Sequence, residues 1–200
     1  MIRFFKNREL SQKLGVNLAR WKRWSREFLP PDPLGGLQSG VARHYSIDDA
    51  FTVYLGGHLV ADLKFSIPEA RCILEDLRSW FGATGVYLNG QLPDEMDDEI
   101  PLPVMDYILF ISRKMEKPDI ASGFRYSIRA IVSRRTVREK GVPIKEERFI
   151  ERWLDSGNED RRQHDMLSLK MLNITEILSR FAAKLSLPAN LFPLLKHRSI

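Results

Sequence analysis

Apolar residues near the start of the chain recur at helical spacing and are interrupted once by a glycine. Leu10 and Leu14 lie four residues apart, which predicts a short first helix. Gly15 favours the end of that helix, and Asn17 is a good N-cap for a second helix over residues 18–28. The pattern therefore predicts two helices joined by a tight glycine turn.

The second predicted helix separates apolar from basic side chains. Leu18, Trp21 and Phe28 can face a core. The remaining arc is basic and consists of Arg20, Lys22, Arg23 and Arg26. Such cations suit phosphates and guanine edges, because they match them in charge and hydrogen-bond geometry. The alternative is a solvated surface helix whose long side chains extend over apolar neighbours.

The next residues predict a turn-rich hairpin and two further helices. Residues 34–40 are rich in glycine, which predicts a hairpin tip, and residues 41–45 can return as a short strand. Ser46 and Ser66 each stand before an apolar run, where an N-cap is expected. We therefore expect one helix after each serine.

The second half of the chain carries strand-like alternation and one heptad-like stripe. Residues 106–115 and 124–137 are predicted to be strands, and residues 147–154 fit either a third strand or a short helix. A long helix is predicted over residues 163–187, because its apolar residues are spaced by four and three. This stripe consists of Leu167, Met171, Ile174, Leu178, Phe181 and Leu185. It indicates either pairing with a second copy of the chain or packing on the chain's own sheet.

Residues between these halves combine glycine, proline and acidic side chains. Residues 84–106 contain six acids and no base. Turn formers and like charges favour a solvated linker over a packed element or a metal-binding loop. The sequence therefore predicts an N-terminal domain over residues 1–81, a linker over 82–103 and a C-terminal domain over 104–200.

Composition is that of an ordinary globular chain, but the charge is unevenly distributed. Hydrophobic residues make up 44% of the 200 residues and charged residues 28%, which excludes a largely disordered chain. Residues 1–43 carry nine Lys/Arg against three Asp/Glu, and residues 107–152 carry twelve against six. These basic segments favour a negatively charged partner, nucleic acid first. We find no bilayer-length apolar run and no signal peptide, so we expect a cytoplasmic protein with no membrane partner.

Motifs for catalysis and metal binding are absent from the sequence. It contains no Gly-x-Gly-x-x-Gly, P-loop, His-Glu-x-x-His or Gly-x-Ser-x-Gly pattern. One cysteine excludes a multi-cysteine zinc site, and the four histidines are scattered without metal-ligand spacing. We therefore expect no enzymatic activity, no metal and no cofactor.

The order of motifs over about residues 6–81 resembles the MerR-type winged helix-turn-helix of transcriptional regulators. ELSQKLGVNLARWKRW is followed by FLPPDP and then by ARHYSIDDAFTVYLGGHLVADLKFSIPEARCILEDL. In that family a helix-turn-helix precedes a wing, an Arg-x-Tyr-like strand end and a helix pair with a Gly-Phe-Ser hinge. Here Lys64 replaces the usual hinge glycine, and Trp21-Lys-Arg-Trp24 replaces Leu-Arg-Tyr-Tyr.

The resemblance implies DNA contacts at the second helix and at the end of the wing. Lys22 matches a helix residue that touches phosphate or a base edge, and Arg43 and Tyr45 match wing-end residues that touch phosphates. The start of the helix, at Asn17 and Arg20, is where base contacts are expected in this geometry. The full candidate set is Asn17, Arg20, Lys22, Arg23, Arg26, Arg43 and Tyr45. The resemblance also implies a homodimer that pairs through a C-terminal helix.

These features together predict an α+β protein with an N-terminal winged helix-turn-helix and a C-terminal small β-sheet followed by a long terminal helix. The expected function is transcriptional regulation, with a homodimer binding an inverted-repeat operator in double-stranded DNA. A mobile-element DNA-binding adaptor, similar to an excisionase, is the first alternative. An enzyme that processes nucleic acid and docks through the winged helix is the second.

Overall fold

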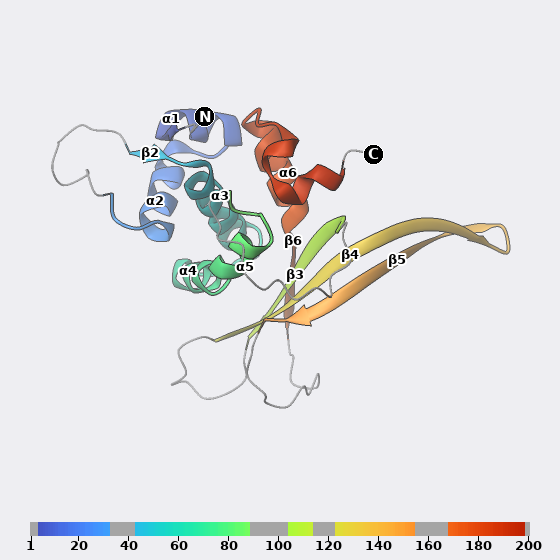
Figure 1. Cartoon of the computed structure of the whole chain (residues 1–200). Coiled ribbons are helices and arrows are strands. Elements are labelled where there is room, and N and C mark those ends of the chain that lie inside the picture. The colour runs from blue at the N-terminus through green and yellow to red at the C-terminus, as the bar shows by residue number, and fades with distance from the viewer. Residues whose placement is uncertain (1–3, 33–42, 89–103, 114–122, 155–167, 199–200) are drawn as a thin grey trace. The chain divides into compact units, whose positions relative to one another are not determined.

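In this computed structural model helices and two short strands come first along the chain, and longer antiparallel strands and a last α-helix follow (Figure 1). The structure describes residues 4–32, 43–88, 104–113, 123–154 and 168–198. Within them the fold is mixed α+β, with six α-helices and two antiparallel sheets. The chain forms two compact units, Met1–Asp94 with Ile177–Lys196 and Glu95–Glu176 with His197–Ile200.

The N-terminal part of the first unit consists of a short two-stranded sheet and five helices. Its strands are β1 (Phe5–Lys6) and β2 (His44–Tyr45). Its first five helices are α1 (Asn7–Leu14), α2 (Leu18–Phe28), α3 (Ile47–Ala61), α4 (Ile67–Asp76) and α5 (Arg78–Ala83). The predicted caps of α3 and α4 are confirmed, because Ser46 and Ser66 each form a capping box with the acid three residues later. The residues predicted to form the wing tip, 34–40, lie outside the described part of the chain.

The predicted linker begins too early in the sequence, because its first seven residues are packed. Gly82 is buried in α5, and Val86 is fully buried. The Tyr87 hydroxyl lies 2.8 Å from the hydroxyl of Thr52, and the backbone N–H of Leu88 donates to Asp48. Apolar and hydrogen-bonding side chains therefore fix residues 82–88 to α3.

The second unit contains a four-stranded antiparallel sheet in the order β5–β4–β3–β6. Its strands are β3 (Asp106–Arg113), β4 (Phe124–Glu139), β5 (Val142–Trp153) and β6 (Leu169–Asn173). The first two predicted strands are confirmed, and residues 147–154 lie largely in a strand. β4 and β5 are joined by the two-residue turn Lys140–Gly141, where both residues have positive φ. That is the turn expected between strands with right-handed twist.

The single helix predicted over residues 163–187 is wrong. Residues 169–173 form strand β6, which pairs with β3. The helix α6 (Ile174–Lys184) begins only after Asn173, whose Oδ1 accepts a hydrogen bond from the backbone N–H of Glu176 at 2.9 Å. Apolar residues that alternate in a strand and then recur in a helix thus imitate one heptad stripe.

The predicted pairing seam is therefore not a surface of one helix. Leu167 lies outside the described residues, and Met171 is an exposed strand residue. The remaining members are all buried inside a single chain, and they are Ile174, Leu178, Phe181 and Leu185. Of the two sequence interpretations of this stripe, pairing with a second copy through these residues is contradicted.

The last helix completes the core of the first unit. The ring of Phe181 lies 5.3 Å from that of Phe51 and 5.6 Å from that of Tyr54, measured between centroids. Lys184 Nζ donates a hydrogen bond to the carbonyl of Leu14. Two short 3-10 helices follow, Ala189–Leu191 and Pro193–Arg198. The predicted domain over residues 104–200 is thus divided, and residues 177–196 belong with the N-terminal elements.

Candidate nucleic-acid interface

The turn between α1 and α2 is built from the local signals that the sequence contains. Gly15 ends α1 with a φ of 70°, a left-handed conformation that glycine adopts without steric penalty. Asn17 caps α2, because its Oδ1 accepts hydrogen bonds from the backbone N–H groups of Ala19 and Arg20. The predicted cap is confirmed, and the Asn17 oxygen is therefore engaged in starting the helix.

Aromatic side chains fix the inward face of α2 against α3. Trp21, Trp24 and Phe28 are buried. A Cβ atom at Gly57 would lie 2.4 Å from the ring of Trp24, and one at Gly56 would lie 2.4 Å from the ring of Phe28. Any larger residue at either glycine would force the helices apart. These adjacent glycines therefore position α2, a role that the sequence analysis missed.

The outward face of α2 is basic and exposed. Its basic side chains are Arg20, Lys22, Arg23 and Arg26. At 100° per residue, the last three lie on one continuous arc, and Arg20 lies at its flank. The guanidinium of Arg20 is 5.9 Å from the ring centroid of Trp24, a cation–π contact that limits its freedom. The structure thus brings together the four residues predicted on this helix.

The only acid of α2 is paired with another helix. Arg71 of α4 donates from Nη2 to Glu27 Oε2 at 2.6 Å and from Nε to the Glu27 carbonyl at 2.8 Å. Among the described residues, no carboxylate forms an ion pair with any of the four basic side chains of α2. The outward arc therefore keeps a uniform positive charge.

The two-stranded sheet and the residue before it carry further exposed or partly exposed basic side chains. Phe5 pairs with Tyr45, and Lys6 pairs with His44. Because residues opposite each other share one face, the exposed Lys6 and His44 lie together while Phe5 and Tyr45 are buried. Arg43 precedes this pair, is partly exposed and lies 5.7 Å from the ring centroid of Tyr45. The predicted cation at the wing end is thus on the surface.

The predicted phosphate contact from Tyr45 is wrong for this placement. Tyr45 is 1% exposed. Its hydroxyl donates to Asn7 Oδ1 at 2.6 Å and lies 3.0 Å from the hydroxyl of Ser25. A phenol that is buried and hydrogen-bonded inside the unit is not available to a phosphate. Tyr45 therefore supports the surface and does not form part of it.

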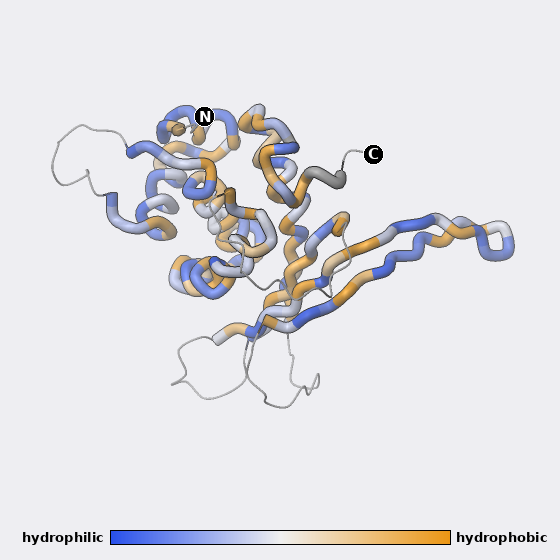
Figure 2. Tube along the Cα trace, in the orientation of Figure 1, coloured by the Kyte–Doolittle hydropathy of each residue, from blue (hydrophilic) through white to orange (hydrophobic). Residues whose placement is uncertain are grey.

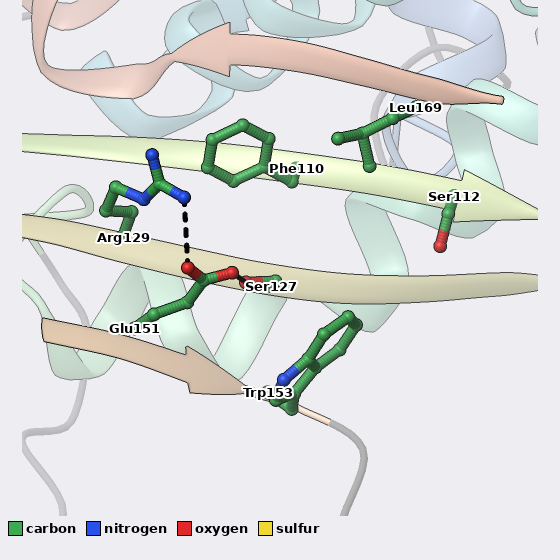
Figure 3. Close-up of a pocket in the computed structure, with 7 residues that line it drawn as sticks. All are labelled: Phe110, Ser112, Ser127, Arg129, Glu151, Trp153 and Leu169. Atoms are coloured by element: carbon green, nitrogen blue, oxygen red, sulfur yellow. Dashed lines mark hydrogen bonds and ion pairs between the residues drawn. The ribbon is translucent and has the colours of Figure 1, made fainter. Parts of the chain in front are cut away.

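One face of the four-stranded sheet forms a second candidate surface. A shallow pocket of about 150 Å³ opens on it, lined by Phe110, Ser112, Ser127, Arg129, Glu151, Trp153 and Leu169 (Figure 3). The guanidinium of Arg129 lies 4.9 Å from the ring centroid of Phe110 and 4.0 Å from that of Phe149. Arg129 also donates to Glu151 at 3.1 Å, as the dashed line in Figure 3 marks. Aromatic rings thus enclose an ion pair.

Exposed apolar side chains surround that ion pair. They are Phe149, Trp153, Leu169 and Met171, each between 44% and 57% exposed. Strand register places all four on the face that carries Phe110 and Ser127. A hydrogen bond from Ser127 and the charge of Arg129 hold the pKa of Glu151 below its ordinary value of 4.5, so the pair stays ionised. We call this surface the outer sheet face.

Metal and membrane features are not found in the described part of the chain. Its residues include no group of three or more His, Cys, Asp or Glu placed to hold a metal ion. The acidic run 94–99 lies outside it. Within the same residues, no helix has the length and apolar character needed to cross a bilayer.

Comparisons of the whole chain with protein-family models, with curated proteins and with solved structures find no match. Functional inference therefore depends on the basic helix face, on the outer sheet face and on the sequence pattern.

Proposed function

We propose that this protein is a transcriptional regulator that binds duplex DNA sequence-specifically through α2. The observation that carries the proposal is the exposed basic arc of α2, which lies opposite an aromatic core and contains no ion-paired cation among the described residues. Nucleic acid is the partner whose charge such a surface complements, and phosphate contacts supply much of the affinity.

The dimensions of α2 suit the major groove. Eleven residues make a helix about 16 Å long, and the major groove is about 12 Å wide, enough to admit one helix. Arg20 lies in the first turn, where residues of a recognition helix reach base edges. In the proposal Arg20 reads a guanine, while Lys22, Arg23, Arg26 and Arg43 bind phosphates or neighbouring bases.

We also propose that the regulator is a homodimer that pairs through the outer sheet face. One helix makes few base contacts, so two copies on an inverted repeat increase both affinity and the length of sequence read. Large exposed apolar side chains around an ion pair that has no net charge are typical of a protein interface, because net charge is depleted at interface cores. A second copy suits this face, since its own Arg129 and Glu151 offer matching charges around a two-fold axis.

The test is DNA binding by the full chain with a pair of charge-matched double variants. In Lys22→Ala/Arg23→Ala two cations of the basic arc are lost, whereas in Lys64→Gln/Arg78→Ala two exposed cations are lost elsewhere in the first unit. Binding to a mixed-sequence 30-base-pair duplex is followed by fluorescence anisotropy at several salt concentrations. We expect the first variant to bind more weakly and to lower the salt slope by about two units, and the control to match the wild type.

Specificity is tested separately with Arg20→Ala. Selection from a pool of random duplexes should yield one consensus with the wild type and a consensus relaxed at one position with the variant, a loss of about 1–3 kcal/mol there. Equal affinity of wild type and Lys22→Ala/Arg23→Ala would refute the assignment of α2. A wild-type pool without any consensus would refute sequence-specific regulation.

A further inference from the structure

The strands β4 and β5 extend well beyond the sheet as a two-stranded ribbon. β3 pairs with β4 only as far as Ile131, whereas β4 and β5 stay paired from Ser133–Arg148 to Glu139–Val142. Seven residues of strand correspond to about 23 Å. Residues 134–149 are exposed except for the half-buried Val137. Figure 1 shows this ribbon projecting from the sheet.

Burial of apolar surface contributes little to the stability of this ribbon, because two strands without a third have few apolar side chains to bury. Its base is held by ion pairs. Arg134 pairs with Glu147 at 2.7 Å and with Asp106, and Arg135 pairs with Glu146 at 2.6 Å. The turn Lys140–Gly141 closes the other end. These contacts stabilise a structure that contributes nothing to a core, which indicates an external partner.

Cross-strand register separates the distal ribbon into a basic and an apolar face. Thr136 pairs with Lys145, and Arg138 pairs with Pro143, which places both cations on one face. Val137 pairs with Ile144 on the opposite face, and Val142 lies on that same face further toward the turn, where it pairs with Glu139. Figure 2 shows hydrophobic and hydrophilic stretches alternating along the ribbon.

The distal ribbon carries a net positive charge. The glutamates at its base are neutralised by the ion pairs described above. Beyond them lie Arg138, Lys140 and Lys145 against the single acid Glu139, and no described carboxylate pairs with these three cations. The apolar tip is also exposed, with Val142 at 61% and Ile144 at 39%. A protein groove would suit the apolar residues, but the cations beside them favour an anionic partner.

We infer that the β4–β5 ribbon is a second DNA-contacting element, which lies along the minor groove and inserts its apolar tip between base steps. The inference rests on the proposed function, since duplex DNA is taken as the partner. Arg138 and Lys145 then bind the phosphates that flank the groove. Val142 and Ile144 act as the wedge, because aliphatic side chains that enter the minor groove partly unstack a step and bend the duplex.

The experiment compares two ribbon variants of the full chain on the mixed-sequence 30-base-pair duplex. Arg138→Gln/Lys145→Gln removes two cations, and Val142→Ser/Ile144→Ser removes the wedge. Lys64→Gln/Arg78→Ala and Leu191→Ser are the matched controls, the latter at an exposed leucine of the first unit. Anisotropy gives the affinity and its salt dependence, and energy transfer between dyes on the two duplex ends reports bending.

We expect the charge variant to lower the salt slope by about two units, and the wedge variant to keep the slope but lose most of the bending. Both controls should behave as the wild type, and circular dichroism should show that all variants are folded. Full affinity and full bending in both ribbon variants would overturn the inference, as would a wedge variant that changes only the oligomeric state in sedimentation.

The two proposals fail in different ways. If Lys22→Ala/Arg23→Ala weakens binding and the ribbon variants do not, the ribbon inference is wrong and the role of α2 stands. If the ribbon variants weaken binding and Lys22→Ala/Arg23→Ala does not, the reverse holds. A wild type that binds no duplex overturns both.

Discussion

A single hydroxyl group, that of Tyr45, connects β2 to the two helices α1 and α2. Its contacts reach Asn7 at the start of α1 and Ser25 within α2, and its ring meets that of Trp21. The neighbouring Arg43 remains at the surface. Tyr45 therefore holds the surface together, whereas Arg43, two residues earlier, lies on that surface.

We predict that Tyr45→Phe destabilises the protein without weakening its affinity for DNA. Loss of the hydroxyl leaves the Asn7 oxygen and the buried Ser25 without this partner, which costs about 1–2 kcal/mol of unfolding free energy. Denaturant unfolding and anisotropy on folded protein measure the two effects. Arg43→Ala is the matched variant, with the opposite outcome. If Tyr45→Phe weakens binding as Arg43→Ala does while stability is unchanged, Tyr45 touches DNA after all.

Elements with a complete local signal were predicted well from the sequence. Asn17, Ser46 and Ser66 mark helix starts because capping depends only on residues two or three positions away. The basic arc of α2 follows equally from helical geometry. The packing role of Gly56 and Gly57 could not be predicted from local sequence, because it depends on which helix crosses α3 at these glycines.

The other differences arose where local patterns were ambiguous. The apolar stripe from Leu167 to Leu185 fits a heptad pattern in the sequence although a strand precedes the helix, and only Asn173 marks the boundary. Gly141 in a short turn between two runs with strand-like alternation would have indicated the hairpin. Residues 82–88 resemble a linker in composition, but tertiary contacts of Val86 and Tyr87 outweigh that preference.

The packing of residues 82–88 predicts an alkaline loss of stability. Burial raises the pKa of Tyr87 from 10.0 to about 12, so the folded state holds this proton more tightly than the unfolded state. The stabilisation is complete below pH 10 and is lost as the pH rises toward 12, a change of about 2–3 kcal/mol.

Tyr87→Phe should remove this component and flatten the dependence of unfolding free energy on pH above 10. At pH 8 the variant should be less stable by about 1 kcal/mol, because the hydrogen bond with Thr52 is lost. Chemical unfolding of both proteins at a series of pH values provides the comparison. If the unfolding free energies of the two proteins change in parallel above pH 10, Tyr87 is solvated, as the linker interpretation required.

At the scale of the whole molecule, the homodimer that we propose pairs through a different surface from the one that the sequence indicated. Leu178 and Phe181 are fully buried in one chain, so a charge placed there unfolds the protein without testing its pairing. Exposed residues of the outer sheet face are the informative positions. Met171 is 57% exposed on the edge strand β6, so its substitution leaves the core intact.

We predict that Met171→Glu converts a wild-type dimer into a folded monomer. Two added carboxylates within the proposed apolar interface must be desolvated on pairing, which costs several kcal/mol. Sedimentation at concentrations on the order of 10 µM measures the outcome, with Leu191→Glu as a matched exposed leucine outside this face. A wild-type monomer under these conditions would contradict the proposed dimer. A Met171→Glu variant that remains dimeric would show that the interface lies elsewhere.

The return of the chain at α6 to the first unit has a consequence for synthesis on the ribosome. Residues 177–196 complete a core that begins at residue 5, with Phe181 against Phe51 and Tyr54. The four strands of the sheet end at Asn173 and are therefore all translated before residues 177–196. The first unit therefore acquires its last helix only after the four strands of the sheet have been synthesised. A chain that ends before residue 177 thus leaves the rings of Phe51 and Tyr54 without their contact with Phe181.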